Sequence, residues 1–487
     1  MRTRRKKKAQ TSECTMKNKK FHSKQMSASS VLAQYVADTR YEDLPANAVA
    51  MAKMSLLDAL GVTLAAGGLC RECRPFVELA IESGGKKEST ILGSRNRVPA
   101  PMAAFANGAM AHALDFEDAH DLALVHPNAA TVPAALAIAE AAGPIDGRAF
   151  IASLAVGCDL VCRLGLALKV NPGEYGWYIP PILGSFGAAA AAGKLLNLNE
   201  IQMLDLFSLT LCQATCSAEL RYSPRSDIRS IRDAFAAKAG VLSARLAQRG
   251  VKGFDHPFEG NAGLFSLYAN GRYDANQLLD GLGTTFEGAN ISFKPWPACR
   301  GTHTYIEAAL HIAKSHALQP ANIDRIRVVV SSFNRMLCEP ETAKKIPQTV
   351  IDAKFSIPFT VATALYHQDV ALKHFTPERL KDKNVLKLAQ KVIYELNPDW
   401  GLREATQGHL EILTKTGSSY SKSIKQAYGH PQHPLLQEDI TAKFISCAGN
   451  AANRIPPAKL KAACESILGL EKMPDVRKLV KLLLPDT

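Results

Sequence analysis

The amino-acid sequence predicts a mainly helical protein in which a large all-helical domain, made of two separate parts, carries an inserted α+β domain. Three observations lead to this fold class. Apolar residues recur three and four positions apart through most of residues 29–268, which is the spacing of amphipathic helices. This pattern stops near Phe286 and returns from Gln437. A chain of 487 residues is also too long for one compact core.

The first part of the helical domain is expected to span residues 26–285. Few alternating β-branched runs occur there, and small residues stand where helices would touch. Gly250 follows the last long apolar pattern and is typical of a helix stop. The predicted helices span residues 31–37, 48–66, 102–113, 131–142, 147–168, 184–196, 201–217 and 233–249.

The inserted α+β domain is expected to span residues 286–430. Segment 291–300 contains two prolines and cannot continue a helix. Residues 323–333 include a run of β-branched residues that predicts a strand, and residues 410–414 and 420–427 flank Gly417 as a predicted hairpin. Helices are predicted at 302–316, 356–367 and 384–396. Because residues 431–487 return to helical spacing, the helical domain is discontinuous and the inserted domain is a candidate lid.

The positive charge is concentrated at the N-terminus. The formal net charge is +13, and residues 1–25 hold ten Lys or Arg against one Glu, which leaves about +4 for the rest. Such a tail can bind nucleic acid or an anionic membrane. No aromatic or helical pattern accompanies the charge, so a disordered basic tail is the favoured interpretation, with the folded part starting at Met26. The tail lacks the apolar region of a secretory signal.

Other features narrow the class of protein. No apolar run approaches the roughly 20 residues of a membrane-spanning helix, so no membrane association is expected. The eleven cysteines form no disulfide framework and are interpreted as buried free thiols, which suits a reducing cytoplasm. No GxGxxG turn and no Gly-rich loop ending in Lys-Ser or Lys-Thr occurs, so nicotinamide and nucleoside triphosphate chemistry have no local support.

The densest polar cluster lies at residues 112–121 and is followed by His126-Pro127. On a helix, His112, Asp115 and Asp118 would share one face, with His126 entering on a loop. A carboxylate beside an imidazole fixes its tautomer and raises its basicity, as general base catalysis requires. A solvated acidic helix end and a metal site are the alternatives. No HExxH, EF-hand spacing or second Cys/His pair supports a metal, and none is predicted.

Three further segments carry groups suited to binding an anion. Lys294 precedes a rigid Pro-Trp-Pro-Ala turn, with Arg300 and His303 close behind it. Arginines within residues 225–232 lie near a helix N-terminus and form a candidate carboxylate clamp. Residues 177–187 offer Ser185 and free amides at a helix start. The alternatives are an ordinary surface lysine, a helix-terminal histidine and a solvated turn.

Taken in order, these segments resemble the MmgE/PrpD family. The similarity runs from about Ser29 to the end of the chain, and several ordered motifs together make it specific for the family. The matching positions are His112, Asp115, Asp118 and His126-Pro127; Gly184-Ser185-Phe186-Gly187-Ala188 with Lys194; Phe293-Lys294-Pro295-Trp296-Pro297-Ala298-Cys299 with Thr302-His303; and Gly429-His430-Pro431 with Lys443-Phe444.

This family includes 2-methylcitrate dehydratase, cis-aconitate decarboxylase and iminodisuccinate epimerase. The resemblance implies a homodimer without metal or organic cofactor, with an active site between lid and helical domain lined by Asp115, His126 and Lys294. Three positions depart from the family pattern. Tyr178 stands at a histidine that dehydratases and decarboxylases use, Arg229 at a lysine and Arg232 at a histidine. Arginine keeps the positive charge but cannot act as an acid near neutral pH.

The expected function is that of a cytoplasmic lyase that abstracts a proton next to a carboxylate of a small polycarboxylate. His126, oriented by Asp115, would be the base, Lys294 would stabilise negative charge, and Tyr178 would donate a proton. Dehydration of a 2-methylcitrate-like acid is the first expectation, with cis-aconitate-type decarboxylation or iminodisuccinate-type epimerisation as alternatives. A non-catalytic polycarboxylate-binding protein and a nucleic-acid-binding protein driven by the tail are the alternatives of other classes. The residues expected to bind substrate are Arg229, Arg232, His303, Ser185 and His112.

Overall fold

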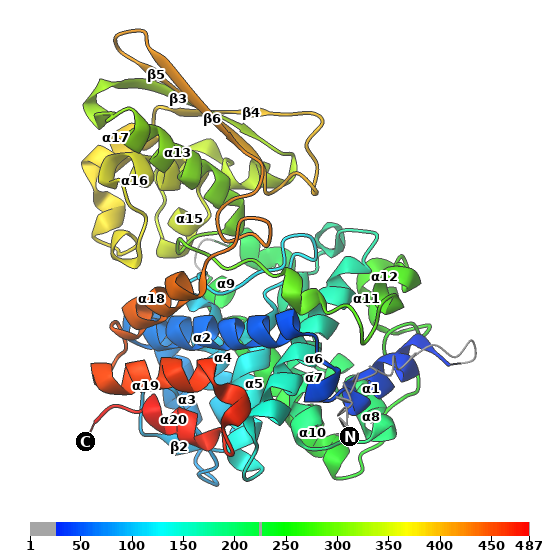
Figure 1. Ribbon diagram of the computed structural model, residues 1–487. Helices are drawn as coiled ribbons and strands as arrows, with labels where there is room; N and C mark the ends of the chain where they lie inside the picture. Colours follow the sequence, from blue (N-terminus) through cyan, green and yellow to red (C-terminus); the bar gives the residue numbers. More distant parts are fainter. Residues whose placement is uncertain (1–25, 224–225, 487) are drawn as a thin grey trace, which may run out of the picture.

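The computed structural model describes residues 26–223 and 226–486 and is mainly helical, as the sequence predicts (Figure 1). The basic tail of residues 1–25, predicted to be disordered, lies outside the described residues. Two hydrophobic cores are present. One joins residues 31–293 with residues 440–483, and the other is built from residues 298–427.

The first core is a stack of helices that pack unusually closely. Its centre holds α4 (Ala100–Ala113), α5 (Pro127–Ala141), α6 (Gly147–Leu166), α7 (Ile179–Leu195) and α10 (Asp233–Gln248). These helices are rich in Ala and Gly, so their backbones approach one another. A Cβ atom on Gly240 would lie 2.6 Å from the backbone of Ala188, so α10 can contact α7 this closely only with glycine there.

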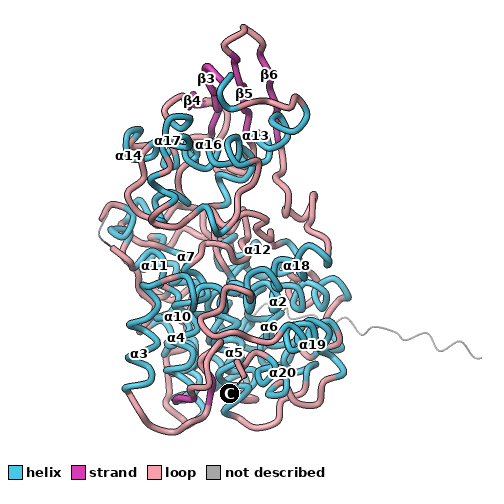
Figure 2. Tube along the Cα trace, turned by 90° about the vertical axis from the view of Figure 1, so that its left-hand side faces the viewer, coloured by secondary structure: helices cyan, strands magenta, loops and turns pink. Residues whose placement is uncertain are grey.

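Shorter and peripheral helices surround this centre. Helix α18, the first helix of the C-terminal part, packs on α2. The last part of the chain therefore completes the core that the first part begins (Figures 1 and 2). The surrounding helices are α1 (Ala28–Asp38), α2 (Ala46–Leu69), α3 (Arg74–Glu82), α8 (Glu200–Leu211), α9 (Ile228–Ile231), α11 (Leu264–Ala269), α12 (Ala275–Leu279), α18 (Gln437–Ala448), α19 (Pro457–Leu468) and α20 (Arg477–Leu482). A two-stranded sheet, β1 (Ser89–Thr90) and β2 (Arg97–Val98), lies beside them.

The second core supports a four-stranded sheet with the strand order β4-β3-β5-β6. In β5 every second residue is buried, because one face of the sheet packs on helices. Figure 2 shows these helices between the sheet and the helical layers below. The elements are β3 (Ile323–Val330), β4 (Val392–Leu396), β5 (Gly408–Thr414) and β6 (Ser419–Ile424), with α13 (His303–Ser315), α14 (Glu341–Lys345), α15 (Val350–Lys354), α16 (Ile357–His367) and α17 (Lys383–Ala389).

In the α+β region the predicted hairpin is confirmed, and one predicted helix is wrong in its second half. The predicted hairpin is formed by β5 and β6, which pair antiparallel. The helix predicted at residues 384–396 ends at Ala389, and its second half forms β4, parallel to β3. Val392, Ile393 and Tyr394 have high strand propensity, and pairing with β3 decides their conformation.

The prediction that no segment is apolar and long enough to cross a membrane is wrong for two helices. By length and composition, α2 and α6 both pass that test, with 72% and 89% of their most apolar windows buried inside the protein. Burial of this kind is typical of core helices in a soluble protein. The ten described cysteines are free thiols, as predicted, although only six of them are buried.

Candidate functional site

The turn after α4 shapes the polar cluster. Helix α4 ends at Ala113, and Asp115 adopts a left-handed conformation with φ of 48°. Among non-glycine residues, Asp is one of the few that tolerate this conformation. The prediction that His112, Asp115 and Asp118 share one helical face is therefore wrong. The turn instead directs the buried side chains of Asp115, Glu117 and Asp118 toward different partners.

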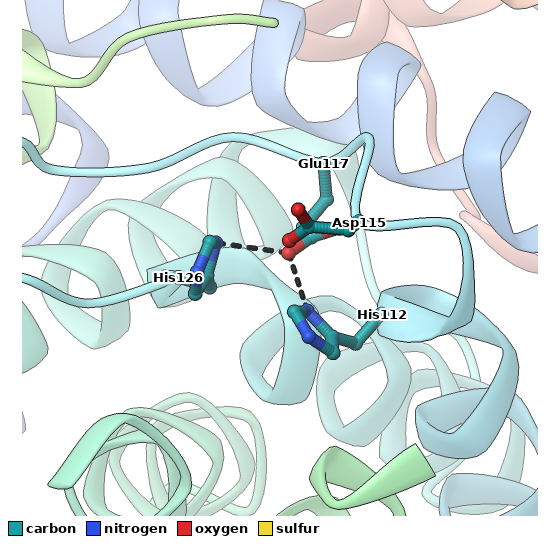
Figure 3. Close-up of side chains that lie close together, drawn as sticks. All are labelled: His112, Asp115, Glu117 and His126. Carbon is teal, nitrogen blue, oxygen red and sulfur yellow. Dashed lines mark hydrogen bonds and ion pairs between the residues drawn. The ribbon is translucent and has the colours of Figure 1, made fainter. Parts of the chain in front are cut away.

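Glu117 is the centre of the cluster. Its Oε1 lies 2.5 Å from Nδ1 of His112 and 2.9 Å from Nδ1 of His126, so the two imidazoles share one carboxylate oxygen (Figure 3). The Nδ1 atom of His126 also lies 3.0 Å from the carbonyl oxygen of Asp118. Since both neighbours of this nitrogen are acceptors, Nδ1 of His126 carries a proton and Nε2 of the neutral ring is the basic atom. Glu117, and not Asp115 as expected, orients His126.

The protonation states of Glu117 and His112 follow from their burial and from the charged residues beside them. Burial raises the pKa of Glu117, but the imidazoles of His112 and His126 and the ammonium of Lys294 outweigh it and hold that pKa well below its usual range. Burial lowers the pKa of His112, and nearby Arg232 lowers it further. A neutral His112 therefore donates its Nδ1 proton to an ionised Glu117.

Asp115 pairs with Lys294. The Lys294 Nζ atom lies 2.9 Å from Oδ1 of Asp115 and 3.0 Å from its backbone carbonyl oxygen, and both side chains are buried. Burial lowers the pKa of Lys294, but the charges of Asp115 and Glu117 outweigh it and raise that pKa above its ordinary value. Lys294 is therefore a buried counter-ion of two carboxylates beneath the site.

Two motifs from the C-terminal half hold this ion pair in place. Gly429, with φ of 89°, accepts a hydrogen bond from the amide of Phe293, and a Cβ atom there would lie 1.9 Å from the Phe293 carbonyl oxygen. Lys443 on α18 donates to the carbonyl oxygens of Phe116 at 2.6 Å and Lys294 at 2.9 Å. Its ammonium also pairs with Asp58 at 2.6 Å. The motifs at 429–431 and 443–444 thus join the two halves of the site.

A cavity of about 140 Å³ lies between the two hydrophobic cores. The helical region contributes a charged floor, and the α+β region contributes a largely apolar wall. Of the nine residues proposed from the sequence, Asp115, His126, Tyr178 and Arg229 line it. The floor also includes His120, Asp121 and Arg221, and the wall includes Cys299, Arg300, Phe333, Met336, Leu337 and Phe355.

Five predicted residues do not line the cavity: His112, Lys294, Arg232, His303 and Ser185. Helix α7 begins at Ile179, because its prolines are favoured in a first turn, so Ser185 lies inside the helix and not at free amides as predicted. The Ser185 hydroxyl donates to the carbonyl oxygen of Pro181 at 3.0 Å. His303 is fully buried, with Nε2 3.0 Å from the carbonyl oxygen of Ala298, and burial together with Arg300 holds its pKa well below the usual range.

Two arginines on the floor are available for an anion. Among the residues that the structure describes, no carboxylate forms an ion pair with Arg221 or Arg229, and Nε of each lacks a hydrogen-bond partner. The guanidinium of Arg229 stacks on the ring of Phe355, 3.6 Å from its centroid. Arg221 and Arg232 lie 4.8 and 5.0 Å from the centroid of Tyr178. An unpaired guanidinium at a cavity is a strong binding group for a carboxylate.

The same cluster could supply ligands to a metal ion. His112, Asp115, Glu117 and His126 each offer one ligand atom, and these atoms lie within 4.8 Å of one another. A metal there would replace the hydrogen bond between His112 and Glu117 and the close contact of His126 with Glu117, and it would lie close to the ammonium of Lys294. The hydrogen-bonded arrangement thus favours a site that holds and moves protons.

Asp118 supplies a stability test. Burial, followed by the charge of Asp58, raises the pKa of Asp118 to about 7, and Asn128 donates to its Oδ2 at 2.5 Å. A raised folded-state pKa means that folding becomes costlier as pH rises from about 4 to about 7. We expect Asp118→Asn to increase the free energy of unfolding, with an advantage that grows by about 1.4 kcal/mol per pH unit over that range. Urea unfolding from pH 5 to 8 measures this, and an advantage independent of pH would contradict it.

Comparisons with known proteins place these observations in a family. The model of the MmgE/PrpD N-terminal domain matches residues 30–276, and that of the MmgE/PrpD C-terminal domain matches residues 296–465. Cis-aconitate decarboxylase of Homo sapiens is 26% identical over 406 residues, which cover 81% of this chain and 82% of that protein. The Mus musculus enzyme of the same name is 25% identical over 443 residues, 88% of each chain. Cis-aconitate decarboxylase-like protein oryM of Aspergillus oryzae is 26% identical over 482 residues, 93% of this chain and 96% of that protein.

Proposed function

The chain belongs to the MmgE/PrpD family, and from this premise we propose that it is a lyase that moves a proton at a carbon atom next to a carboxylate of a small organic acid. Relatives named cis-aconitate decarboxylase support the decarboxylase alternative over dehydration of a 2-methylcitrate-like acid. Decarboxylation of a cis-aconitate-like acid is therefore the first candidate reaction. Dehydration and iminodisuccinate-type epimerisation remain the other candidates.

The fixed tautomer of His126 carries this proposal. Because Glu117 and the Asp118 carbonyl hold Nδ1, Nε2 is the nitrogen left to exchange a proton at the cavity. In a decarboxylation, the protonated ring gives its Nε2 proton to carbon as carbon dioxide leaves. In a dehydration, the neutral ring takes a proton from carbon, and the leaving hydroxyl group takes a proton from a second donor and departs as water. The charge of Glu117 stabilises the imidazolium in both cases.

The arginines and Tyr178 would complete the chemistry. Arg229 and Arg221 would hold carboxylates of the substrate, since both guanidiniums reach the cavity without a carboxylate partner among the described residues. Arginine cannot supply a proton near neutral pH. Tyr178 lines the cavity between Arg221 and Arg232, so its hydroxyl is the candidate second proton donor.

We extend the proposal to the organisation of the protein. Residues 26–285 and 431–487 would form one helical domain and residues 286–430 a lid, because the cavity lies between the two cores. The resemblance to the family also supports a homodimer that works in the cytoplasm without metal or organic cofactor. Size-exclusion chromatography with light scattering would test the homodimer.

A non-catalytic binding protein is the second candidate, since Tyr178, Arg229 and Arg232 depart from the family pattern. A proton NMR time course in deuterated water separates the two, with cis-aconitate, 2-methylcitrate, citrate and iminodisuccinate as substrates. Loss of a carbon-bound proton signal, or a new product signal, would establish proton chemistry and its class. Stoichiometric binding without any exchange would support the binding protein and contradict the lyase.

Glu117→Gln tests the orienting carboxylate. We expect turnover to fall by at least about tenfold with little change in KM, because the amide removes the charge that stabilises the imidazolium of His126. Steady-state kinetics over a range of pH measures this. Glu259→Gln is the matched control, since Glu259 also pairs with a histidine, His256 at 3.0 Å, and does not line the cavity. Equal turnover of Glu117→Gln and the control would exclude the orienting role.

A further inference from the structure

Three consecutive carbonyl groups in the turn after α4 each accept a hydrogen bond from a lysine with a buried side chain. The turn follows the C-terminus of α4, where the helix dipole favours a cation. The three pairs are Lys354 to Leu114 at 2.5 Å, Lys294 to Asp115 at 3.0 Å and Lys443 to Phe116 at 2.6 Å. Glu117 is the next residue, so these lysines hold the turn from which the carboxylate that orients His126 projects.

Lys354 differs from the other two lysines in its origin and in its partners. It ends α15, which lies on the side of the α+β region that faces the helical layers (Figure 1), whereas Leu114 belongs to the helical core. Lys294 and Lys443 also pair with carboxylates, but no carboxylate in the described part of the chain forms an ion pair with Lys354. Burial lowers the pKa of Lys354, and burying a cation without such a partner costs folding free energy. This cost indicates a role beyond stability.

The next residue along the chain contacts the anion-binding side of the site. Phe355 lines the cavity, and the guanidinium of Arg229 stacks on its ring, 3.6 Å from the centroid. Since Nε of Arg229 has no hydrogen-bond partner among the described residues, this stacking contributes to the orientation of its guanidinium. Lys354 itself does not line the cavity, so it can act on a reaction there only through the turn.

We propose that Lys354 and Phe355 are positioning residues through which the α+β region sets both sides of the site. Lys354 holds the turn that carries Glu117, and with it the tautomer of His126, while Phe355 holds Arg229 ready for a carboxylate of the substrate. The group that moves a proton and the group that binds an anion are then in place together only while the α+β region is seated on the helical region. For the reaction this inference rests on the proposed function, but the tautomer and the binding of an unreactive acid can be measured without turnover.

Lys354→Met tests the first contact, since methionine is similar in size and lacks the ammonium. We expect kcat to fall by at least about tenfold with KM within about twofold, because a small displacement of a proton-exchanging group is costly. NMR of the full-length protein with isotope-labelled histidine, at alkaline pH, should show the His126 ring change from protonation at Nδ1 to a mixture of tautomers. The signals of this ring are those that His126→Ala lacks.

The matched control for Lys354→Met is Lys345→Met. Lys345 is also largely buried, but it pairs with Glu341 within α14 and does not line the cavity. Its replacement should leave kcat and the ring signals of His126 as they are in the wild type. Circular dichroism and thermal unfolding show whether each variant is folded.

Phe355→Leu tests the second contact and should show the opposite pattern. Leucine keeps the wall apolar but offers no ring face to Arg229. Propane-1,2,3-tricarboxylate, which has no double bond or hydroxyl group to react, should therefore bind about two- to fivefold more weakly in calorimetry. The KM of whichever acid reacts should rise with it, while kcat and the ring signals of His126 change little.

The outcomes that overturn the inference are distinct for the two variants. A folded Lys354→Met with the ring signals of the wild type would overturn it whatever its turnover, and so would a folded Lys354→Met with the kcat of the wild type. Wild-type affinity for the tricarboxylate in Phe355→Leu would overturn it as well, and this test remains if Lys354→Met does not fold. The expected changes in tautomer and binding without turnover of any acid would uphold the two positioning roles and count against the proposed lyase alone.

Discussion

Replacing His126 with alanine is expected to lower kcat by about a hundredfold or more, with a smaller effect on KM. The reason is that His126 places a basic nitrogen at the cavity, while the carboxylates of the substrate are held by other residues. Steady-state turnover, followed by NMR on whichever acid reacts, measures the loss. Turnover close to that of the wild type would exclude His126 as the group that exchanges a proton with the substrate.

The control for this variant is a histidine of similar hydrogen bonding that does not line the cavity. His409 lies on β5, and its Nδ1 is 2.8 Å from the hydroxyl of Ser423. His409→Ala should leave kcat within about twofold, since His409 is only half-buried and does not line the cavity. Circular dichroism and thermal unfolding of both variants separate a catalytic loss from a loss of folded protein.

Lys294→Met is expected to reduce the free energy of unfolding by about 3–5 kcal/mol, because it leaves the buried charge of Asp115 without its partner. Urea unfolding at pH 7 to 8 measures this. The double variant Lys294→Met/Asp115→Asn should regain part of the loss, since the remaining buried carboxylate, Glu117, keeps its contacts with His112 and His126. Lys459→Met is the control: its pair with Asp486 is partly exposed, and its loss should cost at most about 1 kcal/mol.

The pH dependence of this loss has a definite sign. Burial raises the pKa of Asp115, but Lys294 outweighs it, so the folded-state pKa lies below the unfolded value. Stability from this pair is therefore present above the unfolded pKa and is lost as pH falls through the folded pKa. Without Lys294 the pKa of Asp115 should rise, so Lys294→Met should be less destabilised at pH 5 than at pH 8. A loss that is equal at both pH values would contradict the role of the pair.

Apolar periodicity predicts much of the fold because the formation of a long helix or a hairpin depends mainly on residues close together in sequence. The long helices and the β5–β6 hairpin depend on neighbours in sequence, and their ends agree with the predicted ones to within six residues, the largest difference being the end of α8 at Leu211. Strand β4 lies within a predicted helix because its partner, β3, which decides its conformation, lies more than 60 residues away in sequence. Helix α7 begins five residues before the predicted start, because Pro180 and Pro181 occupy its first turn, where proline is favoured.

For the candidate site too, the sequence predicts which residues lie together but not which of their atoms are in contact. The polar cluster was found from composition, but the left-handed turn at Asp115 decides which carboxylate meets which imidazole. Glu117 stood inside the cluster without an assigned role, since its spacing from His112 fits no helical face. Which arginines stay unpaired depends on distant residues, as for Arg300 and Asp121, and sequence spacing does not reveal it.

The packing of α18 on α2 has a consequence for synthesis on the ribosome. The surface of α2 that α18 covers emerges nearly 370 residues before α18 does, since α2 ends at Leu69 and α18 begins at Gln437. At ordinary rates of translation this interval lasts roughly 20 to 70 seconds. During that time the nascent helical layers carry an uncovered apolar strip, which is the kind of surface that chaperones bind. The buried Lys443 arrives with α18, so the loop that holds Glu117 can be fixed only when nearly the whole chain has been made.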